Sequence, residues 1–142
     1  MRFDMELNKT YTLKGSLSDV YDHFANFEKF ADLHPLFIKV ERLNSTSFKI
    51  YEKPFNWLPI TIKYRAEIEL EENAVYYKAI GLPYKNITLS YTFNDNSPSI
   101  QIDYKVVIKS ILPGKFILLN MMFKAQDQVV KNLQENLKPA TL

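Results

Sequence analysis

The sequence predicts an α+β fold, in which a long C-terminal helix lies on a curved antiparallel sheet of seven strands and two short helices follow the first strand. Three observations predict this class. The C-terminal segment has the periodicity of an amphipathic helix, the body before it alternates between apolar and polar residues, and the connections within that body are short. Short connections join antiparallel neighbours, and helices kept to one side of an antiparallel sheet define the α+β class.

The long helix is expected from Pro113 to Leu137. One face of this segment consists of residues spaced by three and four positions, which is the period of a helix. Its members are Phe116, Leu119, Met122, Phe123, Gln126, Val129, Val130, Leu133 and Leu137. A proline such as Pro113 is tolerated in the first turn, and Pro139 marks the end. At about 1.5 Å per residue the helix is roughly 36 Å long, so it needs a broad surface, which only the strands provide.

The remaining elements follow from alternation and from residues that break it. Gly15 ends the first strand, and Ser16 with Asp19 three residues later is typical of a helix N-terminus. Pro35 ends the second short helix, because the residue before a proline avoids the helical conformation. The expected helices cover residues 17–24 and 27–33, and the expected strands cover residues 3–13, 36–43, 48–53, 60–70, 75–80, 87–93 and 100–108. The last two strands are expected to be joined by a turn at residues 94–98.

Composition and charge limit the kind of protein. The 142 residues are 46% hydrophobic and contain no cysteine, which fits a globular protein of a reducing compartment. The net charge of +2 is too small to favour a nucleic-acid partner. Because the sequence shows neither a signal segment nor an apolar stretch of about 18 residues, we expect no stable membrane insertion. We expect a single domain over residues 1–142, located in the cytoplasm.

Two segments resemble a known superfamily. Residues 17–24 followed by residues 26–30 look like the first helix pair of the START-like, or Bet v 1-like, superfamily, also called SRPBCC, whose architecture is the helix-grip fold. Residues 31–41 are similar to its junction between second helix and strand, particularly in the polyketide cyclase/dehydrase-like branch. The resemblance extends over residues 3–137. It implies an elongated apolar cavity between sheet and long helix, but it places no catalytic motif on this chain.

Four tyrosines occupy the middles of expected strands: Tyr64, Tyr77, Tyr91 and Tyr104. Each is in phase with the apolar residues of its strand, so we expect all four to point to the concave side of the sheet. A symmetrical connection at residues 81–86 would place Tyr77 opposite Tyr91. The four phenols either line a mostly apolar cavity that binds a small molecule, or pack in an ordinary core with each hydroxyl hydrogen-bonded. The resemblance favours the lining.

Three ionisable residues are candidates for chemistry. His34 either caps backbone carbonyls at a helix end, which we favour, or acts as a ligand or base; His23 lies beside an apolar stripe and is a weaker candidate. The sequence has no spacing of histidines typical of a metal site, and we expect neither a metal nor a cofactor. Alternation places Glu52 inward with Ile50, where burial would raise the pKa of its carboxyl. We favour the alternative, in which the strand ends before Glu52 and the carboxylate lies at the rim.

Two apolar segments remain. Phe55 and Trp57 lie on a loop flanked by Pro54 and Pro59, and we expect this loop to cover a cavity that Met121 and Met122 floor. The start of the long helix is apolar nearly all round, so it is covered by this loop, by a membrane or by a second subunit in a homodimer.

Three functions are consistent with these features. The first is a carrier or sensor that binds an apolar or amphipathic molecule such as a lipid, a polyketide or an aromatic compound. The second is an enzyme of the cyclase/dehydratase kind that uses the same cavity. The third is an interaction protein with a filled core that dimerises. Inward ionisable residues favour the enzyme, whereas a cavity lined by apolar groups and phenols favours the carrier.

Overall fold

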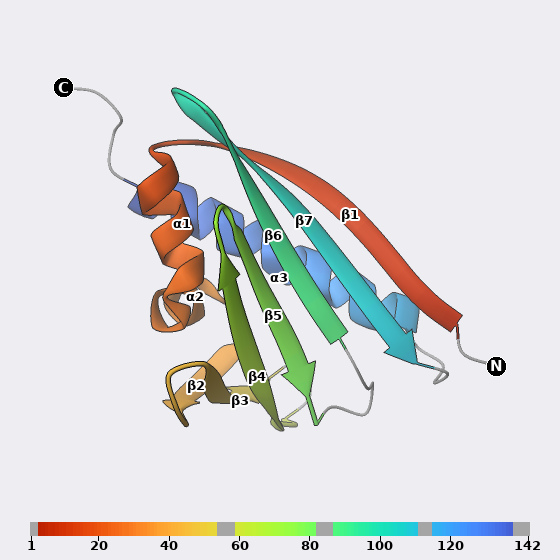
Figure 1. Cartoon of the computed structure of the whole chain (residues 1–142). Helices are drawn as coiled ribbons and strands as arrows, with labels where there is room; N and C mark the ends of the chain where they lie inside the picture. The colour runs from red at the N-terminus through yellow and green to blue at the C-terminus, as the bar shows by residue number, and fades with distance from the viewer. Residues whose placement is uncertain (1–2, 54–58, 82–86, 111–114, 138–142) are drawn as a thin grey trace.

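The computed structural model describes residues 3–53, 59–81, 87–110 and 115–137. In chain order the elements are β1 (Phe3–Lys14), α1 (Leu17–Ala25), α2 (Phe27–Leu33), β2 (Phe37–Arg42), β3 (Ser47–Glu52), β4 (Ile62–Glu71), β5 (Ala74–Ile80), β6 (Ile87–Asn96), β7 (Ser99–Ser110) and α3 (Lys115–Asn136). The protein is therefore α+β with seven strands and a long C-terminal helix, as predicted (Figure 1).

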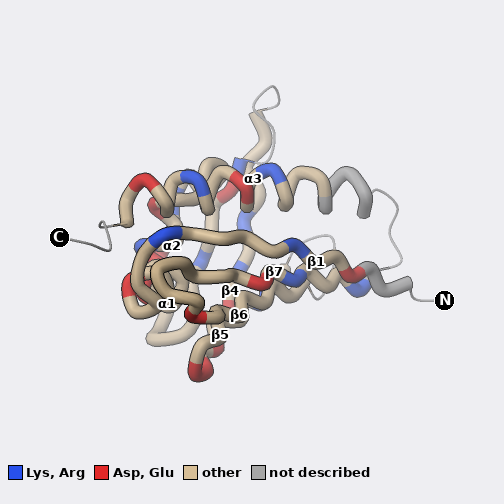
Figure 2. The backbone as a smooth tube through the Cα atoms, turned by 90° about the horizontal axis from the view of Figure 1, so that it is seen from above, with Lys and Arg blue, Asp and Glu red and all other residues tan. Residues whose placement is uncertain are grey.

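All seven strands belong to one antiparallel sheet with the order β1-β7-β6-β5-β4-β3-β2. The sheet is open, with β1 at one edge and β2 at the other. α3 runs along one face of the twisted sheet, and α1 and α2 pack near one end of that face (Figure 1). We call this helix-covered side the inner face. Seen from above, α3 lies beside β1, and positions of both charge signs are scattered along the backbone (Figure 2).

Local sequence signals explain the short helices. The Ser16 hydroxyl accepts a hydrogen bond from the Asp19 amide at 3.3 Å, which caps α1. Asn26 serves both helices: its N–H donates to the Asp22 carbonyl at the end of α1, and its side chain accepts from the Lys29 amide at the start of α2. One residue therefore ends one helix and begins the next, which fixes the angle between them.

The turn predicted at residues 94–98 is present but shorter, at residues 97–98, because β6 and β7 continue into the predicted range. Asn94 pairs with Gln101, and Asp95 pairs with Ile100. The Asp95 carboxylate accepts hydrogen bonds from the Ser97 amide at 3.0 Å and from the Ser97 hydroxyl at 2.7 Å, which closes a tighter turn. The side chains at the end of β6 are polar because they face solvent, and backbone pairing does not depend on apolar residues there.

Hydrogen bonds attach α3 to β1 and to the C-terminal end of α2. The Asp127 carboxylate accepts hydrogen bonds from Lys9 Nζ and from the Tyr11 hydroxyl, both at 2.6 Å. The Asn132 amide donates to the Leu33 carbonyl of α2 at 2.9 Å. On the same helix, Val129 and Leu133 are fully buried in the core. The helix is thereby held in one rotation, which points Met122 and Gln126 inward.

α3 begins at Lys115, and the expected first-turn residue Pro113 lies outside the described residues. At the other end, the Leu137 amide still donates to the Leu133 carbonyl at 2.9 Å, which agrees with the expected end. Within the part of the chain that the structure describes, no helix is long and apolar enough to cross a membrane.

Candidate functional site

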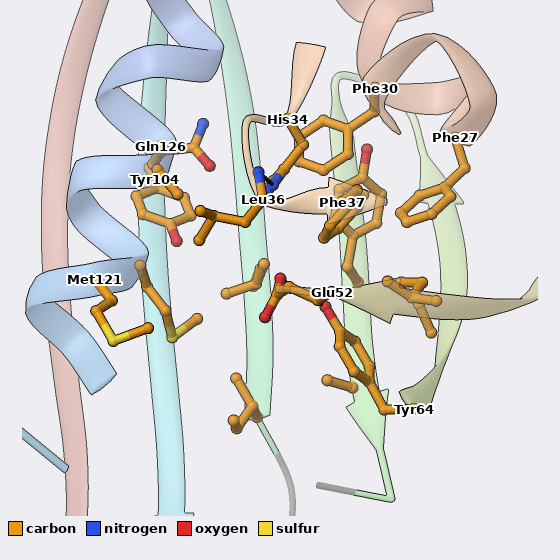
Figure 3. Close-up of a pocket in the computed structure, with 18 residues that line it drawn as sticks. Phe27, Phe30, His34, Leu36, Phe37, Glu52, Tyr64, Tyr104, Met121 and Gln126 are labelled. Carbon is orange, nitrogen blue, oxygen red and sulfur yellow. Dashed lines mark hydrogen bonds between the residues drawn. The ribbon is translucent and has the colours of Figure 1, made fainter. Parts of the chain in front are cut away.

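A pocket lies between the inner face of the sheet, the α2–β2 junction and α3 (Figure 3). Its volume is about 90 Å³. Most of the wall is apolar or aromatic, and each side of the fold contributes to it. Phe27 and Phe30 come from α2, Phe37 comes from β2, and Met121 and Met122 come from α3. The pocket exists because aromatic side chains of α2 and β2 meet the open middle of the sheet without filling it.

The aromatic residues of α2 form one packed cluster with the tyrosines of the sheet. The ring centroids of Phe30 and Tyr77 are 4.9 Å apart, and those of Phe27 and Tyr77 are 5.2 Å apart. The Tyr77 hydroxyl donates to the Phe24 carbonyl of α1. Burial raises the pKa of Tyr77 well above its ordinary value, so this phenol remains a neutral donor. The cluster forms a rigid aromatic wall.

All four strand tyrosines lie on the inner face, as their phase predicts. Tyr77, Tyr91 and Tyr104 are buried, and Tyr64 is half-buried in the pocket. Tyr64, Tyr77 and Tyr104 line the pocket, whereas Tyr91 packs beneath it, with its ring stacked on Tyr104 at a centroid distance of 5.1 Å. That these tyrosines hold a ligand stays a prediction.

The expected pairing of Tyr77 with Tyr91 is wrong. Tyr77 pairs with Leu89, and Tyr91 pairs with Val75 on one side and with Tyr104 on the other. The physical reason is that the connection sets the register. A shift of its centre by one residue moves every cross-strand partner by two, which preserves the facing of each side chain but changes its neighbour.

Glu52 points into the pocket, which corrects the favoured prediction that it lies at the rim. β3 extends to Glu52 because this residue pairs with Ile62 of β4 and with Phe37 of β2. The carboxylate accepts a hydrogen bond from the Tyr64 hydroxyl at 3.2 Å (Figure 3). Burial raises the pKa of Glu52 from its ordinary value of 4.5 to about 7, and the hydrogen bond from Tyr64 opposes this rise. Burial and the neighbouring carboxylate in turn raise the pKa of Tyr64.

No cation balances Glu52 within the described pocket wall, which contains neither lysine nor arginine. Three nearby lysines point to the opposite face of the sheet. Lys39, Lys49 and Lys63 gather there around the Tyr51 ring, with their Nζ atoms 5.5, 5.3 and 5.5 Å from its centroid. The strand alternation that sends Ile50 and Glu52 inward sends Tyr51 and these lysines outward.

His34 lines the same pocket and is neutral. Its ring stacks on Phe37 at a centroid distance of 3.8 Å and an interplanar angle of 12°. Its Nδ1 accepts a hydrogen bond from the Leu36 amide at 3.2 Å, so the ring proton lies on Nε2. Burial lowers the pKa of His34 from 6.5 to about 3. The predicted cap at the helix end is confirmed through the backbone: the N–H of His34 donates to the Ala31 carbonyl at 3.1 Å at the C-terminus of α2, while the ring accepts the hydrogen bond from Leu36.

Gln126 is a site residue that sequence reasoning missed. It is 3% exposed, projects from α3 and lines the pocket (Figure 3). Its Oε1 accepts a hydrogen bond from the Tyr91 hydroxyl at 2.7 Å, and its Nε2 has no hydrogen-bond partner in the described structure. The signal in the sequence was a glutamine within the apolar stripe of the long helix.

Of the remaining residues predicted from the sequence, only the two methionines of α3 are seen to line the pocket. Met121 and Met122 line the pocket on the α3 side, whereas Phe55 and Trp57 lie outside the described residues. His23 lies on α1 away from the pocket, with its Nδ1 2.8 Å from the Asp19 carbonyl oxygen. Among the described residues, no three histidine, aspartate or glutamate side chains come together as metal ligands.

Comparisons with known proteins support the fold. No protein-family model and no curated protein sequence matches the chain. Solved structures do match. A START superfamily protein from Mycobacterium smegmatis has a TM-score of 0.77 and 11% sequence identity, over 93% of this chain and 96% of that one. The major latex-like protein 151 from Panax ginseng has a TM-score of 0.75 and 11% identity, over 96% of this chain and 99% of that one, and the Zhui aromatase/cyclase from Streptomyces sp. R1128 has a TM-score of 0.72 and 10% identity, over 94% of this chain and 90% of that one. The chain therefore has the START-like, or Bet v 1-like, helix-grip fold, and the resemblance seen in the sequence is confirmed at the level of the fold.

Proposed function

We propose that this protein binds a small apolar or amphipathic molecule in the pocket between the sheet and α3. One observation carries the proposal: an aromatic and aliphatic pocket in the interior contains a few converging polar side chains, Glu52, Tyr64 and His34. This composition is typical of small-molecule sites, where apolar walls supply affinity and isolated polar groups fix orientation. A pocket also argues against the filled core that a pure interaction protein would have.

The volume and the walls limit the ligand. Pockets for drug-sized ligands have volumes of roughly 300–1,000 Å³, and an apolar cavity of about 150 Å³ holds benzene. A volume of about 90 Å³ therefore fits a narrow chain or one end of a small ring system. Met121 and Met122 are adaptable residues that widen such a wall by changing rotamer.

Filling the pocket is expected to abolish binding without unfolding the protein. Ala79 of β5 is half-buried and lines the pocket, so Ala79→Leu places a larger side chain in the binding volume. NMR titration with the small neutral probe 2-phenylethanol, and any small molecule that co-purifies in native mass spectrometry, provide the readouts. We expect at least a tenfold loss of affinity for 2-phenylethanol and loss of the co-purified mass.

Lys78→Leu is the matched control, because Lys78 adjoins Ala79 on the same strand but is exposed. It is expected to retain the affinity for 2-phenylethanol and the co-purified mass of the unmodified protein. Equal binding by the Ala79→Leu and Lys78→Leu proteins would place the binding site elsewhere and refute the proposal.

A second function, catalysis by proton transfer, is favoured by one specific observation. A carboxyl with a pKa of about 7 in an apolar pocket has the properties of a general acid–base group at neutral pH. The structural neighbour named as an aromatase/cyclase has the same fold. In this function Glu52 removes or returns a proton, and the neutral His34 donates a hydrogen bond from Nε2.

The test uses 5-nitrobenzisoxazole, which opens when a base removes one proton. We expect the protein to accelerate the opening with a rate that rises through pH 7, because Glu52 acts as a base only when ionised. Glu52→Gln is expected to lose more than 90% of this rate, whereas Glu69→Gln, which replaces an exposed carboxylate on β4, retains it. A rate that does not depend on Glu52 would reject the catalytic function and leave the binding function standing.

A further inference from the structure

We infer that the pocket selects an organic cation: a small molecule with an apolar body and a protonated amine nitrogen that lies against Glu52. This inference rests on the proposed binding function and specifies the class of ligand. It starts from a mismatch in the structure, namely an inward carboxyl group that hydrogen-bonds one phenol and has no cationic partner in the described pocket wall.

The charges around Glu52 favour a cation over an anion. The titratable side chains that face the pocket with it are Tyr64 and Tyr104 from the sheet and His34 from the α2–β2 junction, and the described lining of α3 contributes methionines, Ala125 and Gln126. None of these groups is positive at neutral pH, because burial keeps His34 neutral by lowering its pKa. Within the described pocket wall, a ligand carboxylate would meet a second carboxylate and no counter-ion, whereas an ammonium group supplies a partner for Glu52.

The rings beside Glu52 favour the same ligand. Phe37 is its backbone partner on β2, and Tyr64, on the other neighbouring strand, donates to its carboxylate. The carboxyl group thus lies between two aromatic residues, and Phe27 and Phe30 continue the wall (Figure 3). Aromatic faces attract an ammonium group through the ring quadrupole, and this attraction is strongest where water is excluded. A carboxylate combined with aromatic rings recognises a cation, and the same rings accept its apolar body.

The pH dependence follows from the ion pair. The ammonium group binds the ionised form of Glu52, whose pKa in the free protein is about 7. Below this pH the carboxyl group has to lose its proton on binding, so the affinity falls by about tenfold for each further pH unit. An amine whose own pKa lies near 10 stays charged throughout this range. A neutral analogue has no such dependence, and a carboxylic acid has the opposite one.

The experiment compares three probes of similar shape by NMR titration at pH 8 and pH 6: 2-phenylethylamine, 2-phenylethanol and 3-phenylpropanoate. We expect the amine to bind at least tenfold more tightly than the alcohol at pH 8, and 3-phenylpropanoate to bind most weakly. Between pH 8 and pH 6 the affinity of the amine is expected to fall about tenfold, while that of the alcohol stays constant. Calorimetry at pH 6.5 in two buffers of different ionisation enthalpy should show proton release when the amine binds.

Variants and outcomes separate this inference from the proposed function. Glu52→Gln should remove the preference for the amine and retain binding of the alcohol, and Glu69→Gln should change neither. The proton release is measured on the unmodified protein, so the inference stays testable even if Glu52→Gln fails to fold. Equal binding of amine and alcohol, or tighter binding of the alcohol, overturns the inference while the binding function stands. Failure of all three probes to bind counts against the binding function itself.

Discussion

Replacing Glu52 by Gln is expected to stabilise the protein at alkaline pH. The folded protein holds the proton of Glu52 up to a pKa of about 7, whereas the unfolded chain releases it near 4.5. Between these values the folded state binds more protons than the unfolded state, so its stability falls as the pH rises from 4.5 to 7. The Glu52→Gln protein lacks the titrating carboxyl group and so does not lose this stability. Its free energy of unfolding, relative to the unmodified protein, should increase by about 2 kcal/mol between pH 5.5 and pH 8.

His34 has the opposite effect on the pH dependence of stability. Its pKa is about 3 in the folded protein and near 6.5 in the unfolded chain, so the folded state binds fewer protons between these values and stability falls as the pH falls from 6.5 toward 3. The two groups together predict greatest stability between pH 5 and 6. Urea unfolding at pH 4, 5.5 and 8 measures this, with Glu69→Gln as the control for an exposed carboxylate. A parallel pH dependence for the Glu52→Gln protein would show that this carboxyl is not the group that titrates.

Replacing Phe30 by Ala is expected to cause the largest loss of stability of any change proposed. Phe30 is 2% exposed, and six aromatic side chains surround its ring: Phe24, Phe27, His34, Phe37, Tyr77 and Tyr91. Removing the ring eliminates its apolar burial and leaves a cavity, which costs about 3–5 kcal/mol. The urea midpoint is the measurement, and Phe30→Leu, which keeps most of the volume, should cost less than half as much.

The same change has a second expected effect, on the ligand. Because Phe30 lines the pocket, its removal enlarges the binding volume. The folded Phe30→Ala protein should therefore bind a larger probe such as 2-(1-naphthyl)ethylamine more tightly, relative to 2-phenylethylamine, than the unmodified protein does. An unchanged ratio of the two affinities would mean that Phe30 stabilises the fold without limiting the ligand.

Periodicity predicted the parts of this protein in which one face is buried. The stripe that includes Val129 and Leu133 predicted α3, and the phase of the four tyrosines predicted their inward direction. Each of these signals is local, because the residues that produce it belong to one element. The pairing of Tyr77 was missed because register depends on the centre of a connection, which periodicity does not contain.

The polar residues of the site were harder to predict for the same reason. Glu52 lies inward because Phe37 and Ile62, far from it in the sequence, pair with it and extend β3 by one residue. His34 became a pocket residue through its stacking on Phe37. Gln126 has a visible signal, a glutamine in an apolar stripe, but its partner Tyr91 comes from a different element. Burial of a polar group is a tertiary property, and the sequence shows only the position at which it occurs.

The contact between α3 and the end of β1 has a consequence for solubility. β1 is an edge strand, and such a strand presents unpaired N–H and C=O groups to which a strand of another molecule can add. The side chain of Gln134 accepts a hydrogen bond from the Lys14 amide at 2.9 Å and donates one to the Lys14 carbonyl at 3.1 Å. Its carboxamide thus has the hydrogen-bonding pattern of a peptide group and occupies the position that the next strand would take. The long helix therefore also closes this stretch of the sheet edge against intermolecular β-pairing, which is the first step of aggregation.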